Sequence, residues 1–169
     1  MPEPFSSEEI RQFLDCYNPE FRGNGNGLFS DCSPVEREIR KKDIALIYRW
    51  KLGRIRNSDV EAINNNIEQF RQAIRDANIA GSEVNAINQL IAINGCGLAV
   101  ASAILSVYHP EKFTIIDRRV LQELGFQERR SETTGWNADS YWREFVPRVL
   151  EFAEFHGVDL RTADKILWG

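Results

Sequence analysis

Residues 83–105 read EVNAINQLIAINGCGLAVASAIL, and the structure expected for this stretch decides the fold. Before the turn, apolar residues recur at steps of three or four, as they do on one face of a helix. After the turn, LAVASAIL is an almost unbroken run of apolar and small residues. The four residues from Asn94 to Gly97 are too few for anything but a tight turn. The pattern predicts a helical hairpin over about 83–107.

Helical patterns continue on both sides of this hairpin. A stripe of apolar residues between Val60 and Ala77 predicts a core-facing helix that begins at Ser58, with Glu61 completing a capping box. The other expected elements are an extended crossover at 112–116 and helices over about 117–124, 138–156 with a kink at Pro147, and 160–167.

The N-terminal part carries further helix signals. Ser6 and Glu9 form a capping box for a helix that runs to about Tyr17, and a flexible glycine-rich turn follows at 21–29. A helical region then starts at Ser33-Pro34, with a break near Asp43 and a second segment through Trp50. We find no pair of alternating strand patterns and no linker. The expected fold is all-α, a compact multi-helix domain over 1–169.

Composition is typical of a small globular protein. A chain of 169 residues suits one domain, and 43% hydrophobic residues are enough for a packed core. No apolar run approaches the roughly 20 residues that span a bilayer, and the N-terminus has no signal-like core, so we expect a cytoplasmic protein without a membrane partner. Three widely spaced cysteines, Cys16, Cys32 and Cys96, predict reduced, mostly buried thiols.

Charge is unevenly distributed along the chain. The formal net charge of -4 argues against a protein that binds DNA mainly by counterion release. Between Arg37 and Arg56, however, eight basic residues stand against two acidic ones. This segment is either an ordinary solvated helix face or a surface that faces phosphates.

The turn at Gly95 and Gly97 is suited to an anion. Glycine tolerates positive φ and lets another backbone approach, while the helix that follows presents unpaired N–H groups and the positive end of its dipole. A phosphate fits there without any net positive charge on the protein. Many helix pairs that bind nothing are also joined by a glycine turn, so the turn alone leaves both interpretations open.

The segment Ile91–Asp117 resembles the helix-hairpin-helix region of the DNA glycosylase superfamily. That family reads approximately L-P-G-V-G-x-K-x-A at the turn and V-D after an apolar helix; here residues 93–101 read INGCGLAVA, and Ile116-Asp117 follows at the family's spacing. The resemblance implies a glycosylase-like fold and double-stranded DNA as partner, contacted at its phosphate backbone and at a flipped base. The residues implied in DNA binding are Asn94, Gly95, Cys96, Gly97, Leu98, Arg118 and Arg119.

Two further features are implied by this resemblance. The family's catalytic aspartate falls on Asp117, where a carboxylate would stabilise the positive charge that develops on a sugar during glycosidic cleavage. Asp117 could equally serve only as the N-cap of the next helix. Backbone carbonyls of Ile91, Ile93 and Cys96 would hold Na⁺ or K⁺ at the turn; no other cofactor is expected.

Departures from the family pattern narrow the chemistry. The lysine with which bifunctional relatives form a Schiff base is Ala99 here, which implies a monofunctional enzyme that only hydrolyses the base. Lys51 is the nearest candidate for a substitute nucleophile, without a motif to support it. Asn94 replaces the usual proline, Arg118-Arg119 replaces Thr-His, and the absence of cysteines after Cys96 excludes the iron–sulfur cluster that some relatives carry.

Other candidate residues have simpler explanations. Five aromatic residues could form a base pocket or a wedge, although aromatics at helical spacing usually belong to the core: Tyr48, Trp50, Trp136, Tyr141 and Trp142. His109 and His156 lie at expected helix ends and are interpreted as cap or surface residues.

The leading hypothesis is a monofunctional DNA glycosylase of the base-excision repair type, associated with the nucleoid if it binds DNA. The damaged or mispaired base cannot be deduced from sequence. One alternative is a helix-hairpin-helix module that binds DNA without chemistry, and another is a helical interaction protein that has lost DNA binding.

Overall fold

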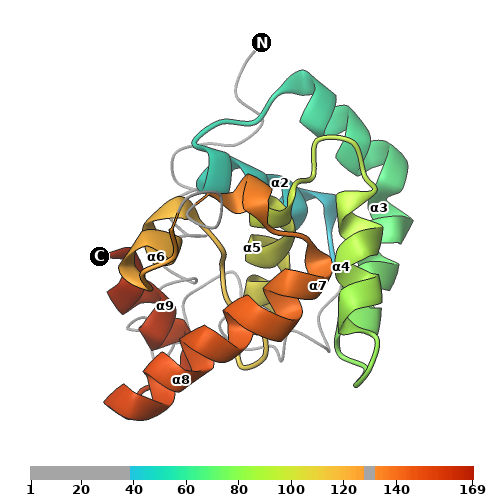
Figure 1. The fold of residues 1–169 in the computed structure, drawn as a ribbon. Coiled ribbons are helices and arrows are strands. Elements are labelled where there is room, and N and C mark those ends of the chain that lie inside the picture. Colours follow the sequence, from blue (N-terminus) through green and yellow to red (C-terminus); the bar gives the residue numbers. More distant parts are fainter. Residues whose placement is uncertain (1–38, 128–131) are drawn as a thin grey trace, which may run out of the picture.

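The computed structural model describes residues 39–127 and 132–169, and its regular elements are helices (Figure 1). These residues contain no strand, which confirms the all-helical prediction for the described part of the chain. The helix expected at 6–17, the glycine-rich turn at 21–29 and the start of the region from Ser33 lie outside it, as do Cys16 and Cys32. No described helix is long and apolar enough to cross a membrane.

The elements follow one another with short connections. In chain order they are α2 (Lys41–Leu52), α3 (Asn57–Ala77), α4 (Glu83–Ile91), α5 (Leu98–Tyr108), α6 (Arg118–Glu123), a 3₁₀ turn (Thr133–Gly135), α7 (Ala138–Ser140), a π-helical segment (Tyr141–Phe145), α8 (Val146–His156) and α9 (Leu160–Trp168).

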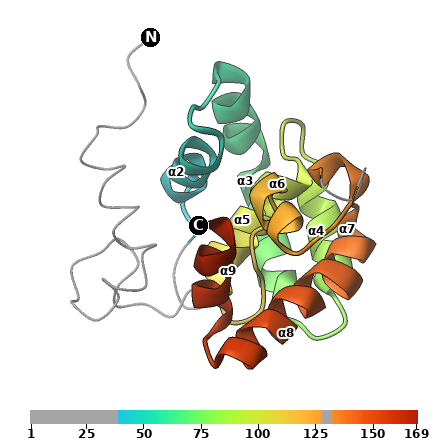
Figure 2. The same cartoon turned by 60° about the vertical axis from the view of Figure 1, so that its left-hand side comes forward.

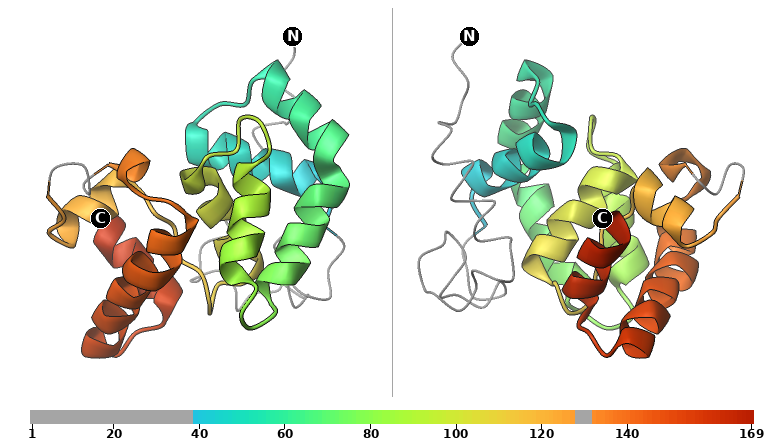
Figure 3. Two further views of the ribbon diagram at one scale, coloured as in Figure 1. Left: turned by 45° about the vertical axis from the view of Figure 1, so that its right-hand side comes forward. Right: turned by 90° about the vertical axis from the view of Figure 1, so that its left-hand side faces the viewer.

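Helix α5 is the centre of the arrangement. Ten of its eleven residues are buried, as expected for a helix that is apolar on all sides. Helices α2, α3 and α4 pack around it, and α6, α8 and α9 form a second group on its other side (Figure 3). Each buried Leu, Ile or Val side chain contributes roughly 1.5–3 kcal/mol, so this enclosure is a major source of stability.

Helix α3 carries the expected apolar stripe but begins differently. The predicted capping residues were Ser58 and Glu61, whereas the helix begins at Asn57 and Asp59 accepts from the backbone N–H of Arg56 at 3.1 Å. The Arg56 guanidinium also bonds the Asp59 carboxylate, an ion pair that helix propensities do not reveal. The stripe is confirmed, since Ile63, Phe70, Ile74 and Ala77 are buried and Val60 and Ile67 are half-buried.

Two other predicted helix boundaries agree closely with the structure. The segment expected after a break near Asp43 is α2, which begins at Lys41 after the extended residue Arg40; Asp43 lies in its first turn, where it is buried and paired with Arg40. The helix expected from Ala138 to His156 spans these residues as α7, the π-helical segment and α8, and the π-helical segment lies directly before Pro147, where a kink was expected. Pro147 has no N–H to donate, and in the π-helical turn before it the backbone hydrogen bonds span five residues instead of four.

His109 ends α5, as expected for a cap residue, but it is not on the surface. Its side chain is buried, and Nε2 donates to the Ile74 carbonyl at 2.7 Å. Burial lowers the pKa of His109, so the neutral ring is favoured in the fold. His156, at the end of α8, is exposed as expected.

The turn between α4 and α5 uses its two glycines differently. Gly95 has φ +84°, and a Cβ there would lie 2.8 Å from Oδ1 of the buried Asp59. Gly97 has φ -84° and ψ 177°, which any residue can adopt, and a Cβ there would meet no atom within 4 Å. Only Gly95 is therefore required by the fold.

This difference predicts unequal effects of alanine. Gly95→Ala should destabilise the protein by roughly 2–4 kcal/mol, because it adds positive-φ strain to a clash with the buried Asp59 carboxylate. Gly97→Ala should cost less than about 1 kcal/mol, mainly because alanine is a poorer N-cap. Urea unfolding of both variants checks this through the midpoints at unchanged m. Equal midpoints would contradict the role given to Gly95.

Candidate functional site

The N-terminus of α5 opens onto the surface at the turn. Asn94, Gly95 and Gly97 are exposed, and Gly97 is the N-cap of α5 without a side chain to occupy the first-turn N–H groups. Cys96 and Leu98, which were also predicted to bind DNA, have buried side chains. At these two positions only the backbone could contact a ligand.

The side chain of Cys96 packs into the core beneath the turn. Its thiol is buried and free, as predicted, and burial raises its pKa to about 12. The buried Tyr48 side chain lies against it, and burial raises the pKa of Tyr48 as well. Both groups stay neutral near pH 7, so they hold the turn by packing and supply no reactive anion.

The predicted cation ligands are chemically suitable. The Ile93 carbonyl accepts from the Cys96 N–H at 3.0 Å and has a second lone pair. In the described part of the chain, no backbone N–H donates to the carbonyls of Ile91 or Cys96. Three carbonyls at the end of α4 and in the turn could thus hold a monovalent cation.

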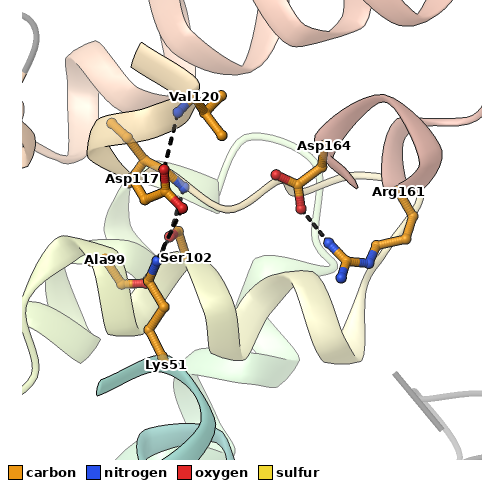
Figure 4. A network of polar contacts seen from close by, with 8 residues as sticks. Lys51, Ala99, Ser102, Asp117, Val120, Arg161 and Asp164 are labelled. Atoms are coloured by element: carbon orange, nitrogen blue, oxygen red, sulfur yellow. Dashed lines mark hydrogen bonds and ion pairs between the residues drawn. The ribbon is translucent and has the colours of Figure 1, made fainter. Parts of the chain in front are cut away.

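Ser102 ties the crossover to α5. Its hydroxyl donates to the Ala99 carbonyl at 2.9 Å and accepts from the backbone N–H of Ile116 at 3.1 Å. The residue before Asp117 is thereby fixed to the first turns of α5. Figure 4 shows Ser102, Ala99 and Asp117 gathered at this point.

Asp117 uses its two carboxylate oxygens differently. Oδ1 accepts from the backbone N–H of Val120 at 3.0 Å, so Asp117 is the N-cap of α6. Oδ2 lies 3.5 Å from Nζ of Lys51. The side chains of Asp117 and Lys51 are 15% and 14% exposed, so the pair is largely shielded and still reachable from solvent. Capping therefore leaves one oxygen of Asp117 for another role.

Lys51 reaches Asp117 from the last turn of α2. Figure 4 shows its side chain rising beside Ala99 toward the carboxylate. An ammonium from a helix distant in sequence thus lies beside Ala99 and Asp117. The sequence contained the basic run around Lys51 but no sign of this contact.

A second ion pair lies behind Asp117 and was missed by sequence reasoning. Arg161 and Asp164, one turn apart on α9, form an ion pair with side chains only 8% and 5% exposed. The pKa of Asp164 is raised to about 6, first by burial and also by the negative charge of Asp117, while Arg161 and Lys51 act in the opposite direction. The i, i+3 spacing was the only sequence signal.

The two arginines after Asp117 have partners within the protein. Arg118 pairs with Glu132 at 3.1 Å, and both side chains are about half exposed or more. The guanidinium of Arg119 lies 5.2 Å from the ring centre of Trp168, which is 53% exposed. Figure 2 shows α9, which carries Trp168, beside α6. Contact with DNA would require either arginine to share or leave its partner.

The aromatic candidates belong to the core. Tyr48, Tyr141 and Trp136 are buried, and Trp50 and Trp142 are half-buried and packed against the core cluster. Tyr141 donates to the Thr114 carbonyl at 2.6 Å. The simpler explanation given to these residues accounts for what is seen.

Comparison with known proteins adds no relative to this picture. The chain matches no known protein family, no curated protein and no solved structure. Support for a function therefore comes from the geometry around Asp117 and the α4–α5 turn.

Proposed function

We propose that this protein is a monofunctional DNA glycosylase, which hydrolyses the N-glycosidic bond of a damaged or mispaired base. The observation that carries the proposal is that the two carboxylate oxygens of Asp117 have different partners. One carboxylate oxygen caps α6, and the other lies in a shielded position close to the surface beside Lys51. A helix cap alone needs no second charged partner.

The chemistry required is the stabilisation of a positive sugar. As the bond from C1′ to the base breaks, the base leaves with the bonding electrons and takes up a proton, and positive charge develops on the sugar. The carboxylate of Asp117 would offset this charge and orient the water that attacks C1′. Lys51 would hold the carboxylate in place until a substrate approaches.

The α4–α5 turn would hold the DNA backbone. Gly97 leaves the first N–H groups of α5 open to a phosphate oxygen, and the helix dipole favours negative charge there. A Na⁺ or K⁺ on the carbonyls of Ile91, Ile93 and Cys96 would add positive charge at the same place. The flipped base would then enter near Asp117, and the enzyme would act where chromosomal DNA is found.

A DNA-binding module without chemistry is the second candidate. It is favoured by the ion pair itself, since Lys51 neutralises Asp117 in the free protein. A panel of duplex oligonucleotides carrying different lesions, scored for abasic sites, separates the two functions. Duplex binding without any abasic product would favour the module.

The first test concerns backbone-led binding. Gly97→Val should abolish duplex binding, because a branched side chain covers the N–H groups of α5 while the extended backbone tolerates it. Wild-type affinity should fall only shallowly with salt, with a slope that corresponds to about two or three phosphates. Fluorescence anisotropy with duplex DNA measures both the affinity and its salt dependence.

The control for this test is Ser82→Val, which places the same residue at the N-cap of α4, away from the turn, and should bind normally. Unchanged affinity of folded Gly97→Val would defeat the idea.

The second test separates chemistry from capping at Asp117. Asp117→Asn keeps a cap oxygen for Val120 and should change stability by no more than about 1 kcal/mol. Excision should slow by about two orders of magnitude or more, equivalent to roughly 3 kcal/mol of barrier, with little change in binding. Single-turnover rates on the best substrate of the lesion panel provide the measurement.

The matched control for this test is Asp159→Asn. Asp159 caps α9 through the N–H of Thr162 at 2.7 Å, as Asp117 caps α6. Its replacement should leave the excision rate unchanged. Wild-type rates in Asp117→Asn as well would reduce Asp117 to a helix cap.

The third test concerns Lys51 as a rival nucleophile. Base release should leave an intact abasic strand, and borohydride should trap no protein–DNA adduct, because Ala99 offers no amine and Lys51 is paired as an ammonium. Denaturing electrophoresis after borohydride treatment shows the result. An adduct that disappears in Lys51→Ala would replace the monofunctional assignment with a lyase.

A further inference from the structure

The ion pair on α9 is placed to act on the candidate site. Helix α9 packs against α6, whose N-cap is Asp117, and against α8. Figure 4 shows the Asp164 carboxylate on the side of α9 that faces Asp117, with Arg161 behind it. The charges of Asp117 and Lys51 act on Asp164 across this space. Two carboxylates and two cations from α2, α6 and α9 thus form one electrostatic cluster.

The arginines on α6 and α8 have different partners. On α6, Arg118 pairs with Glu132 and Arg119 stacks on Trp168. On α8, Arg148 donates to the Leu124 carbonyl at 3.1 Å. The groups that act on the Asp164 carboxyl are Arg161, Asp117 and Lys51.

The protonation of Asp164 determines the net charge of the cluster. With both carboxylates ionised, the two negative charges balance Lys51 and Arg161. With Asp164 protonated, the cluster carries one net positive charge. A sugar that becomes positive beside Asp117 is repelled when Asp164 is protonated and is not repelled when Asp164 is ionised, because charges in a shielded site interact strongly.

We propose that Asp164 is a positioning residue, whose carboxylate sets the charge that Asp117 and Lys51 present to a positively charged sugar. The inference rests on the proposed function, because only a reaction that builds positive charge next to Asp117 would use it. The competing explanation is that Arg161 and Asp164 merely anchor α9. An anchor would affect stability but not the charge preference of the site.

The first measurement needs no DNA. The side-chain ¹³C carboxyl shift of Asp117 is followed by NMR in the full-length protein from about pH 4.5 to about pH 8. The wild type should show a step centred near pH 6, the pKa of Asp164. The step should vanish in Asp164→Asn and persist in Asp139→Asn, which alters an exposed aspartate–arginine pair.

The second measurement uses a charged sugar mimic. Two duplexes are compared, one carrying a cationic pyrrolidine in place of one deoxyribose and one carrying the neutral tetrahydrofuran analogue. The preference for the cation should rise about tenfold in the wild type between about pH 5 and about pH 7.5. Asp164→Asn should show at all pH values the weak preference for the cationic duplex that the wild type shows near pH 5. Asp164→Glu should restore the increase of this preference with pH.

The outcomes separate this inference from the proposed function. The proposal is overturned if the Asp117 shift lacks a step near pH 6, if Asp164→Asn retains the step, or if this variant shows the wild-type rise in cation preference. A clear step in a protein that binds neither duplex confirms the coupling and instead refutes the glycosylase. The wild-type pH series gives an answer even if Asp164→Asn fails to fold.

Discussion

The enclosure of α5 is the constraint on which the rest of the structure depends. A helix that is apolar on every side must be surrounded, so only its ends can present backbone groups to a ligand. Its C-terminal end is closed by the buried His109. Its N-terminal end opens at Gly97, and the crossover returns to the same end because Ser102 holds Ile116 there. The place of Asp117 thus follows from the burial of α5 and one serine hydroxyl.

Stability alone gives little reason for the charges around Asp117. A largely shielded pair such as Lys51–Asp117 adds little net stability, because the attraction between the ions is offset by the hydration that both lose. A nearly buried pair such as Arg161–Asp164 is often no better than apolar residues of the same volume, because both ions lose hydration. Net stability therefore does not account for the gathering of these four charged groups around the start of α6.

The sequence predicted the features that depend on local pattern. The α4–α5 turn, the apolar stripe of α3 and the helix after Asp117 each arise from residues close in the chain. It could not distinguish Gly95 from Gly97, because the difference is made by Asp59, which reaches the turn from another helix. Lys51 lies 66 positions before Asp117, and no spacing rule links them. The pair on α9 does have a local spacing, i, i+3, but this spacing is common on solvent-exposed helices and did not single the pair out.

The two carboxylates of the cluster come from helices that pack on each other, whereas Lys51 comes from another group of helices. Asp117 caps α6, Asp159 caps α9, and the two helices pack together, so the relation between Asp117 and Asp164 is set by one group of helices. Lys51 comes from α2, which packs on α5 in the other group. Asp117 is nevertheless held to α5 as well, through the bond between Ser102 and Ile116, so α5 fixes both partners of the Lys51–Asp117 contact.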